Sequence, residues 1–343
     1  MSKRPTIQDL AQAAGVSLAT VDRVLNNRQR VKESTAHRVM LAAEDIGYYA
    51  AGLIKHRIKA SKPQYRLHFL LQKEEEVFYL QLSEALQTAV GDHPDMQGSA
   101  RVDFVGEINP RTIAQRLREA AEHADALGIV AINHPLVAEA IDEVAAQGVP
   151  VFCLVTDVVA PGRAGYVGPD NHKRGRTAAW AVSRLSRSPG KVAIMLGTHR
   201  YQSQEISEIS FRSYLREYAP EFQVLESVLN LDENRLAYEA AVSLLTSNPE
   251  LVAIFSAGGG MEGLVQAVRD EGRDQDLVLV CNELTPFSRG ALRDHTIDLL
   301  VATPIARLAT AAVDAMIEAI VQPTNLGMRE IALPVDLYLA ENI

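Results

Sequence analysis

The stretch that most constrains the fold is residues 6–26, TIQDLAQAAGVSLATVDRVLN, which predicts two short helices around a tight turn. Thr6 and Asp9 have the spacing of a capping box at the start of the first helix. Gly15 stands at the end of that helix, where a left-handed residue costs least, and Ser17 can cap the second. The apolar residues fall on one face of each helix: Ile7, Leu10, Ala11 and Ala14, then Val21, Val24 and Leu25. Such a helix-turn-helix can place its second helix in the major groove of DNA.

The run AGVSxxTVxRVLN, residues 14–26, is more specific than a generic pair of helices. It resembles the DNA-binding headpiece of the LacI/GalR family of bacterial transcription regulators. The resemblance implies a sequence-specific regulator, most simply a repressor, that binds double-stranded operator DNA as a homodimer. Two-fold symmetry of the protein suits two half-sites in a roughly palindromic operator. The resemblance also implies that the rest of the chain senses a small molecule.

Side chains that match the DNA-contacting positions of the family follow from the same resemblance. Those expected to contact bases are Leu18, Ala19 and Arg23, of which arginine can bind guanine through two hydrogen bonds. Those expected to contact phosphates, which position a protein without reading sequence, are Thr6, Ser17, Thr20, Asn26 and Thr35. These residues also have ordinary roles as caps or turn residues. Asp22 replaces a serine common in the family, and the sequence gives no account of it.

A third helix is expected from about residue 32 to 46, so that the headpiece covers residues 1–48 and a linker covers residues 49–63. In relatives this linker becomes helical on DNA and wedges an apolar side chain into the minor groove. Here the wedge position carries Arg57, with Leu53 and Ile58 as apolar neighbours. We therefore expect no standard wedge. Lys55 and Arg57 are instead assigned to phosphates or to the width of the minor groove.

The charge of the chain is divided unevenly. Residues 1–62 contain eleven Lys or Arg and five Asp or Glu, a net charge of +6. The other residues contain 23 basic and 38 acidic side chains, a net charge of −15, which gives the total of −9. A basic segment on an acidic body is what a domain that binds phosphates needs.

After residue 63 short apolar runs alternate with amphipathic segments, which predicts an α/β domain with parallel sheets covered by helices on both faces. Expected strands are 66–71, 102–105, 126–132, 150–155, 191–196, 223–228, 251–256, 277–281 and the C-terminal tail. Two doubly wound subdomains with late crossovers resemble the periplasmic-binding-protein-like fold. We expect one subdomain to comprise residues 64–165 with 287–322, and the other 166–286 with 323–343. Together they would form the ligand-sensing and dimerisation domain.

Ligands of open α/β sheets bind beyond the carboxyl ends of the strands, and polar or aromatic residues at those ends are the candidate contacts. After the first strand come Phe78 and Tyr79, which suit stacking on a sugar, although Phe78 also suits the core. After later strands come Asn133, His134 and Asp157. In the second half the candidates are Glu205, Glu208 and Glu283, and a small polar metabolite, most simply a sugar or sugar derivative, is the expected ligand.

If Asp157, Glu205, Glu208 and Glu283 share one site, the sequence shows no counter-charge for them. Uncompensated buried carboxylates are costly, so a cationic metabolite such as an amino sugar is the alternative ligand. The opposing interpretation places Glu205 and Glu208 on the solvated face of their helix. Gly258-Gly259-Gly260 lacks the Lys and Ser/Thr of a nucleotide-binding loop.

The composition supplies the remaining expectations. Hydrophobic residues make up 47% and charged residues 22% of the 343 residues, as in ordinary globular proteins. No run reaches the roughly 18 apolar residues of a membrane helix, and the start of the chain lacks a secretory signal, so a cytoplasmic protein is expected. Cys153 and Cys281 are expected to be buried free thiols. No metal or catalytic motif stands out, so no cofactor is expected; a binding protein or α/β enzyme without DNA function remains the alternative.

Overall fold

The computed structural model describes residues 4–26, 31–54, 62–106, 108–323 and 327–343. By its contacts the chain divides into two compact units, Met1–Tyr65 with Gly91–Ser99, and Arg66–Val90 with Ala100–Ile343.

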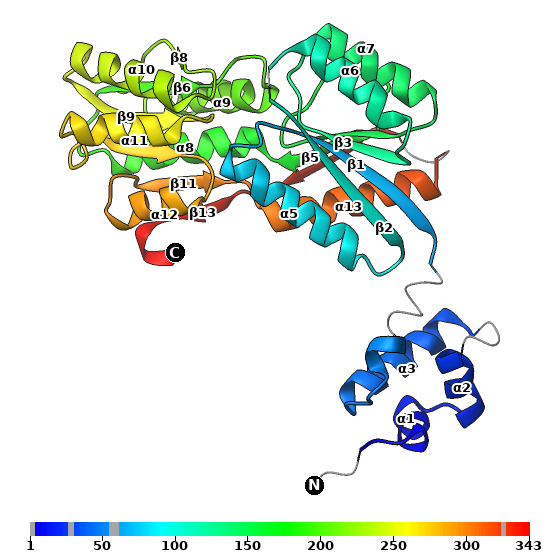
Figure 1. Ribbon diagram of the computed structural model, residues 1–343. Helices are drawn as coiled ribbons and strands as arrows, with labels where there is room; N and C mark the ends of the chain where they lie inside the picture. The colour runs from blue at the N-terminus through cyan, green and yellow to red at the C-terminus, as the bar shows by residue number, and fades with distance from the viewer. Residues whose placement is uncertain (1–3, 27–30, 55–61, 107, 324–326) are drawn as a thin grey trace. The chain divides into compact units, whose positions relative to one another are not determined.

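The N-terminal helices are α1 (Ile7–Ala14), α2 (Leu18–Asn26) and α3 (Glu33–Asp45) (Figure 1). The capping box is present, because the Thr6 side chain accepts a hydrogen bond from Asp9 N and the Asp9 carboxylate accepts one from Thr6 N at 2.7 Å. Gly15 ends α1 with φ 62°, in the left-handed region expected for it. The predicted apolar faces form the core of this domain, with Leu10 and Val21 fully buried.

The core of the headpiece extends past residue 48, where the sequence placed its boundary. Ala50 and Ile54 are buried in the same apolar cluster as the three helices, and residues 51–54 are helical. The side chain of Leu53, which directly precedes Ile54, is 49% exposed and faces away from that core. The headpiece is therefore defined here as residues 4–54 of the described chain. Lys55, Arg57 and Ile58, which belong to the predicted linker, lie outside the described residues.

The larger unit contains two sheets, and each forms one lobe. The first lobe has the order β12-β5-β4-β3-β1-β2. Its strands are β1 (Gln64–Gln72), β2 (Gln97–Val105), β3 (Ala126–Ile129), β4 (Val151–Leu154), β5 (Gly165–Pro169) and β12 (Arg329–Leu333). Its helices are α5 (Val77–Asp92), α6 (Pro110–Ala121), α7 (Pro135–Ala146) and α13 (Ile305–Val321). Helices α6 and α7 cover one face of the sheet, and α5 and α13 lie on the other (Figure 1).

The second lobe is built around the order β13-β11-β10-β9-β6-β7, with β8 also paired to β6. Its strands are β6 (Lys191–Leu196), β7 (Gln223–Val224), β8 (Val228–Leu229), β9 (Leu251–Ser256), β10 (Val278–Cys281), β11 (Leu299–Ala302) and β13 (Asp336–Tyr338). Its helices are α8 (Asn171–Leu185), α9 (Gln202–Tyr218), α10 (Asn234–Ser247), α11 (Met261–Asp270) and α12 (Pro286–Arg293), with a short 3-10 turn η1 (Ala340–Asn342).

The central strands of the second sheet, β6, β9, β10 and β11, are buried on both faces, because successive side chains of a strand point to opposite sides and helices cover both. Along β6, Val192, Ile194 and Leu196 pack toward α8 and α9. Ala193 and Met195 pack on the other side, toward α10 and α11. This explains why these strands read as continuous apolar runs in the sequence.

The doubly wound α/β architecture is confirmed, but the predicted division between the lobes was wrong in its last part. Helix α12 and strand β11, which the sequence assigned to the first lobe, belong to the second sheet and its covering helices. The C-terminal segment, assigned to the second lobe, is shared: β12 pairs with β5 in the first sheet, and β13 pairs with β11 in the second. The lobes are thus joined at Asp170, at Thr303–Pro304 and at Pro334–Val335.

Two further expectations concern the chain as a whole. Cys153 and Cys281 are free and buried, as predicted, and burial raises the pKa of both thiols. Among the described residues, none of the helices combines the length and apolar character needed to cross a lipid bilayer.

Candidate functional site

The exposed start of α2 carries the three predicted base-contacting side chains. Leu18 is 46% exposed, and Ala19 and Arg23 are also exposed. These side chains are not part of the headpiece core. The residues that α2 contributes to that core include Val21 and Val24, on the opposite face of the helix. An exposed leucine beside an arginine on a helix of this motif is a surface able to contact base edges.

Polar side chains at both ends of α2 are held in place by local hydrogen bonds. Ser17 Oγ accepts a hydrogen bond from Thr20 N at 3.2 Å, the N-cap predicted from the sequence, and lies 2.9 Å from Thr20 Oγ1. Asn26 Nδ2 donates to Asp22 Oδ1 at 2.7 Å. The structure thus gives Asp22 a role that sequence reasoning missed, because it orients Asn26, one of the predicted phosphate contacts.

The other predicted DNA contacts are partly described. Thr6 is exposed at the N-cap of α1, and Thr35 is half-buried in the first turn of α3. Lys55 and Arg57 lie outside the described residues, so their assignment to DNA remains a prediction.

A cavity of about 390 Å³ lies between the two lobes, at the carboxyl ends of their strands. From the first lobe it is lined by the end of β1 and the start of α5, and from the second by the ends of β9 and β10 and the loop after β8. Lys73 crosses the cavity, because its Nζ donates to the carbonyl oxygens of Leu231 at 3.2 Å and Asp232 at 3.0 Å. The position and volume are those of a small-molecule site in this kind of fold.

Strained backbone gathers around this cavity. Among described non-glycine residues with positive φ, four line it: Lys73 (25°), Val155 (64°), Asp232 (55°) and Glu283 (64°). A β-branched residue such as valine is strongly disfavoured there. Unfavourable backbone conformations persist where the surrounding structure enforces them, and they cluster at ligand sites.

Three of the predicted ligand contacts line the cavity: Phe78, Tyr79 and Glu283. The rings of Phe78 and Tyr79 meet edge to face with centroids 5.1 Å apart. Burial raises the pKa of the Tyr79 hydroxyl well above its ordinary value, and nearby Tyr201, Asp232, Glu76 and Glu283 raise it further.

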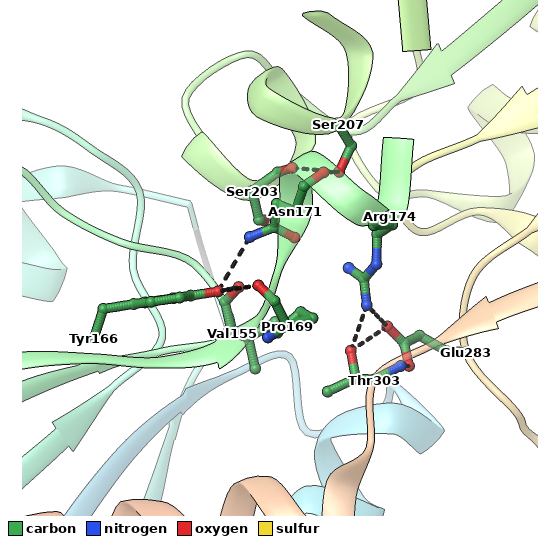
Figure 2. A network of polar contacts seen from close by, with 9 residues as sticks. All are labelled: Val155, Tyr166, Pro169, Asn171, Arg174, Ser203, Ser207, Glu283 and Thr303. Atoms are coloured by element: carbon green, nitrogen blue, oxygen red, sulfur yellow. Dashed lines mark hydrogen bonds and ion pairs between the residues drawn. The ribbon is translucent and has the colours of Figure 1, made fainter. Parts of the chain in front are cut away.

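Glu283 has a counter-charge, contrary to the expectation from sequence. Arg174, which is 4% exposed on α8, donates from Nη2 to Glu283 Oε1 at 3.3 Å and to Thr303 Oγ1 at 2.7 Å (Figure 2). Thr303 in turn donates to Glu283, from Oγ1 at 2.7 Å and from N at 2.9 Å. This network ties the end of β10 to the crossover after β11.

The crossover after β5 has a second network, at Asp170 and Asn171. Asp170 caps α8, accepting from Lys173 N at 3.0 Å. Asn171 Nδ2 donates to the Tyr166 hydroxyl at 3.1 Å, and that hydroxyl lies 2.9 Å from Pro169 O and 3.1 Å from Val155 O (Figure 2). The pair therefore organises the turn between the lobes, and neither residue lines the cavity.

Asn133, His134 and Asp157 were predicted to point into the cleft, and the structure corrects this, since none of them lines the cavity. Asn133 Oδ1 accepts from Val159 N at 3.1 Å. His134 is the N-cap of α7, with Nδ1 accepting from Leu136 N at 3.1 Å. The Asp157 carboxylate is paired with Arg163 at 2.9 Å. Each side chain is engaged by its own loop or helix end.

Glu205 and Glu208 also lie outside the cavity lining, so their prediction as ligand contacts is corrected too. Glu205 is exposed on α9, as the opposing interpretation held. Glu208 accepts hydrogen bonds from Ser227 at 2.5 Å and from Arg212 at 2.8 Å. Burial acts to raise the pKa of Glu208, but these hydrogen bonds outweigh it and hold the pKa below its usual range.

Several polar side chains of the cavity were missed by sequence reasoning: Gln72, Lys73, Glu76, Arg174, Gln204, Asp232 and Asn282. Gln72 is the last residue of β1, and Lys73 follows it. Asn282 directly follows β10, so a search for polar residues at the carboxyl ends of strands could have found all three. Asp232 follows a strand of two residues, and Arg174 lies inside a helix, where no local pattern distinguishes it.

The three consecutive glycines line the cavity because the backbone of this loop lies against Asp232. Gly259 N donates to Asp232 Oδ1 at 2.6 Å. A Cβ on Gly258 would lie 2.7 Å from the same oxygen, and Gly260 has φ 81°, a conformation that glycine adopts without strain. The loop thus serves to hold a carboxylate, which is consistent with its lacking the side chains of a phosphate-binding loop.

Two carboxylates of the cavity are held in an environment that disfavours their charge. Burial raises the pKa of Asp232, although the hydrogen bond from Gly259 and the nearby Lys73 oppose this. Burial also raises the pKa of Glu76, and Asp232 and Glu262 add to the effect while Lys73 opposes it. In the described part of the chain, no group of three or more His, Cys, Asp or Glu side chains is arranged to hold a metal ion.

The comparisons with known proteins divide the chain in the same way. Residues 6–50 match the family described as bacterial regulatory proteins, lacI family, and residues 69–322 match the periplasmic binding protein domain. An uncharacterized HTH-type transcriptional regulator of Streptomyces limosus is 25% identical over 344 residues, 93% of this chain and 89% of that protein. The HTH-type transcriptional regulator GalR of Streptococcus thermophilus is 49% identical over 45 residues, 12% of this chain and 14% of that protein.

Solved structures resemble the two lobes. The glucose-galactose binding protein GanP of Geobacillus stearothermophilus matches with a TM-score of 0.75 and 17% identity, over 82% of this chain and 99% of that one. A solute-binding protein of Agrobacterium vitis, bound with alpha-D-tagatopyranose, matches with a TM-score of 0.74 and 18% identity, over 81% and 95%. These likenesses establish the fold of the lobes.

The family match over most of the chain, the helix-turn-helix match at its start and the two-lobed cavity agree with one another. The chain therefore belongs to the periplasmic binding protein domain family and to the LacI-type bacterial transcription regulators, which join such a domain to an N-terminal DNA-binding helix-turn-helix.

Proposed function

We propose that this regulator is a repressor whose affinity for its operator is controlled by a sugar or sugar derivative bound between the lobes. One observation carries the proposal: the same chain has an exposed arginine-bearing recognition helix and a cavity lined from both lobes. A ligand that contacts both lobes favours one arrangement of them, which is the differential interaction that allosteric control requires.

Sugar is the proposed ligand class for two reasons. Aromatic rings, carboxylates and amides line the cavity together, and this mixture suits the apolar faces and hydroxyls of a sugar. Solved relatives of the lobes include proteins described as binding glucose and galactose, tagatose, arabinose or fucose. A regulator of this kind acts in the cytoplasm, as a binding protein and not as an enzyme, with no cofactor.

The proposed assembly is a homodimer on a roughly palindromic operator. One headpiece presents only α2 to the major groove and so reads few base pairs, whereas two related by a two-fold axis read two half-sites. The proposed functional division keeps a DNA-binding headpiece, a linker and a sensing domain. The packing of Ala50 and Ile54 supports placing residues 50–54 in the headpiece and not in the linker.

The first prediction tests DNA recognition through Arg23. Replacing Arg23 with Ala in the full chain should weaken operator binding by about 1–3 kcal/mol and relax the preference at one symmetric base pair, if the side chain binds guanine with two hydrogen bonds. Fluorescence anisotropy with DNA from upstream of the protein's own gene, and with single-base variants of the bound site, measures both effects. Arg116→Ala, which removes an exposed arginine of α6, should leave binding unchanged.

Two outcomes would contradict this assignment. An equal loss on every DNA sequence would make Arg23 a phosphate contact. Absence of specific binding by the wild-type chain to any upstream fragment would remove the support for a repressor acting at its own gene.

A further inference from the structure

The charged groups of the cavity are mostly acidic. Its lining includes five carboxylates and two cationic side chains. The carboxylates are Glu75, Glu76, Asp232, Glu262 and Glu283, and the cations are Lys73 and Arg174. This excess of acidic over basic side chains favours a ligand of positive charge.

Both cations are already engaged by the protein. Arg174 is bound to Glu283 and Thr303, and so compensates one carboxylate only. Lys73 donates its hydrogen bonds to the carbonyl oxygens of Leu231 and Asp232. Lys73 lies near the acidic side chains and lowers their pKa values in part, but it makes no direct ion pair with them within the described residues.

Among the cavity carboxylates that are not exposed, Glu76 and Asp232 have no ion pair in the described chain, whereas Glu283 is paired with Arg174. They reach the cavity from different lobes, Glu76 from just before α5 and Asp232 from the loop after β8. Asp232 Oδ1 accepts from Gly259 N at 2.6 Å and from Gln204 Nε2 at 3.4 Å. Burial raises the pKa of both carboxyl groups. A cation bound between them would relieve the cost of their burial.

Amide oxygens of the same cavity also lack partners. Gln72 is 2% exposed, and its Nε2 donates to Val130 O at 2.6 Å, which fixes the orientation of the amide. Its Oε1 is buried with no hydrogen bond, and so is Oδ1 of Asn282, which is 6% exposed. Both residues line the cavity. Neither oxygen is accessible from the cavity, so both are unpaired acceptors behind its surface and not contacts of its open space.

The arrangement suits an organic cation better than a metal ion. Within the described ranges, the carboxylates do not converge as a metal-binding group, so their charge is spread around the cavity. The rings of Phe78 and Tyr79 lie among them, and aromatic faces attract ammonium groups as well as sugar rings.

We propose that the ligand of this cavity is a sugar that carries a protonated amino group, with the amine bound by Glu76 and Asp232. The proposal rests on the proposed function, since it keeps a sugar as the effector and specifies its charge.

The experiment compares matched sugars on the full-length protein by isothermal titration calorimetry at neutral pH. The probes are D-glucosamine, D-galactosamine and D-mannosamine, each beside its neutral parent sugar and its N-acetylated form. We expect one amino sugar to bind more tightly than both of its matched forms. Glu76→Gln and Asp232→Asn should each weaken that binding by about thirtyfold or more, as expected when one partner of a buried charge pair is removed. Glu205→Gln, exposed on α9 outside the cavity, is the matched control and should bind normally.

Two results would overturn the proposal. Equal or tighter binding of a neutral or N-acetylated sugar would show that the cavity does not recognise the amino group. The proposal that a sugar controls the repressor would still stand. Binding of none of the nine probes would reject the amino sugar as a class, while operator binding by the same preparation would show separately that the regulator is folded and functional.

Thermal unfolding without ligand provides a second measurement. Glu76→Gln and Asp232→Asn should unfold at a temperature equal to or above that of the wild-type protein, because each removes a partly buried charge that forms no ion pair. Glu208→Gln, which removes a carboxylate bound by Arg212 and Ser227, should unfold at a lower temperature. Marked destabilisation by both cavity variants would identify structural carboxylates and contradict the proposal.

Discussion

At the scale of single residues, the carboxylates of this protein fall into two groups with opposite effects on stability. Those with a cationic partner, such as Glu208 on α9 and Asp294 after α12, have lowered pKa values. Those in the cavity, Glu76 and Asp232, have raised pKa values because burial outweighs their neighbours. The first group stabilises the fold, and the second is the pair that we propose binds the ligand.

The residue-scale prediction concerns the pH dependence of Asp232. Its pKa in the folded protein lies above the unfolded value of about 3.9. At a pH above the folded-state pKa, the ionised side chain therefore lowers the free energy of unfolding, and this cost disappears as the pH falls below about 3.9. Asp232→Asn should exceed the wild-type protein in unfolding free energy at neutral pH, and the difference should shrink as the pH approaches 4. Urea unfolding at several pH values measures it.

A variant that should change the unfolding free energy in the opposite direction provides the control for Asp232→Asn. Burial acts to raise the pKa of Asp294, but hydrogen bonds from Thr296 and the ion pair with Arg269 at 2.6 Å lower it. Asp294→Asn should therefore reduce the unfolding free energy at neutral pH, and the loss should fade as the pH drops through the ordinary range of Asp. A difference for Asp232→Asn that does not change with pH would show that its charge is not the cause.

At the scale of elements, the segment after α3 is part of the headpiece and not of a free linker. Ile54 is fully buried, while Leu53 beside it is 49% exposed. A three-helix domain of this size buries little apolar surface, so one added side chain matters. The exposed Leu53 is the apolar residue of this segment that is free to reach DNA.

The element-scale prediction compares these two neighbours. Ile54→Ala should destabilise the headpiece by about 2–5 kcal/mol, the usual cost of removing a buried aliphatic side chain, whereas Leu53→Ala should leave its stability unchanged. Hydrogen exchange of the headpiece amides in the full chain measures both. On operator DNA, Leu53→Ala should retain DNA bending, because Arg57 stands at the wedge position; loss of bending with Leu53→Ala but not with Arg57→Ala would restore the standard wedge.

At the scale of the whole sensing domain, the lobes meet through a few polar contacts across the cavity. Lys73 donates to the loop after β8, Asn133 N donates to Arg200 O at 2.8 Å, and Ser203 N donates to Thr156 Oγ1 at 3.1 Å. The Arg174–Glu283 pair lies beside the crossover at Thr303 (Figure 2). Contacts of this kind form and break as two lobes close and open on a ligand.

The prediction at this scale tests the contact made by Lys73. Lys73→Met should weaken ligand binding by about 1.5–3 kcal/mol, the range for hydrogen bonds from a charged donor, because it removes a bond that holds the lobes closed. Calorimetry with a binding sugar, with and without operator DNA, measures this loss and the coupling between the two sites. Coupling must be reciprocal, so operator DNA should change the affinity for the sugar by the same factor as the sugar changes the affinity for DNA.

The matched variant for Lys73 is Lys73→Arg, which keeps the charge and the donors. It should retain most of the affinity. Equal losses in both variants would mean that the contact does not depend on a charged donor, and an unchanged affinity in both would mean that it does not hold the lobes together.

The sequence by itself determined the headpiece and the class of the larger domain. Thr6, Asp9, Gly15 and Ser17 act within a few residues of one another, so their spacing alone predicts the caps and the turn. The continuous apolar strands and amphipathic helices likewise predict a parallel sheet covered on both faces. The short elements α12 and β11 escaped detection because eight and four residues carry little periodic signal.

Only the tertiary structure decided which polar side chains form the site. The end of a strand is visible in the sequence, but the partners of the side chain that follows it are not. Glu208 accepts hydrogen bonds from Ser227 and Arg212. Glu283 accepts one from Arg174, which lies 109 positions earlier in the chain. Asp232 reaches the cavity only because a glycine loop lies against it. The charge of a site is set by such distant contacts, and for that reason the sequence predicted an acidic cavity from four carboxylates of which only Glu283 lines it.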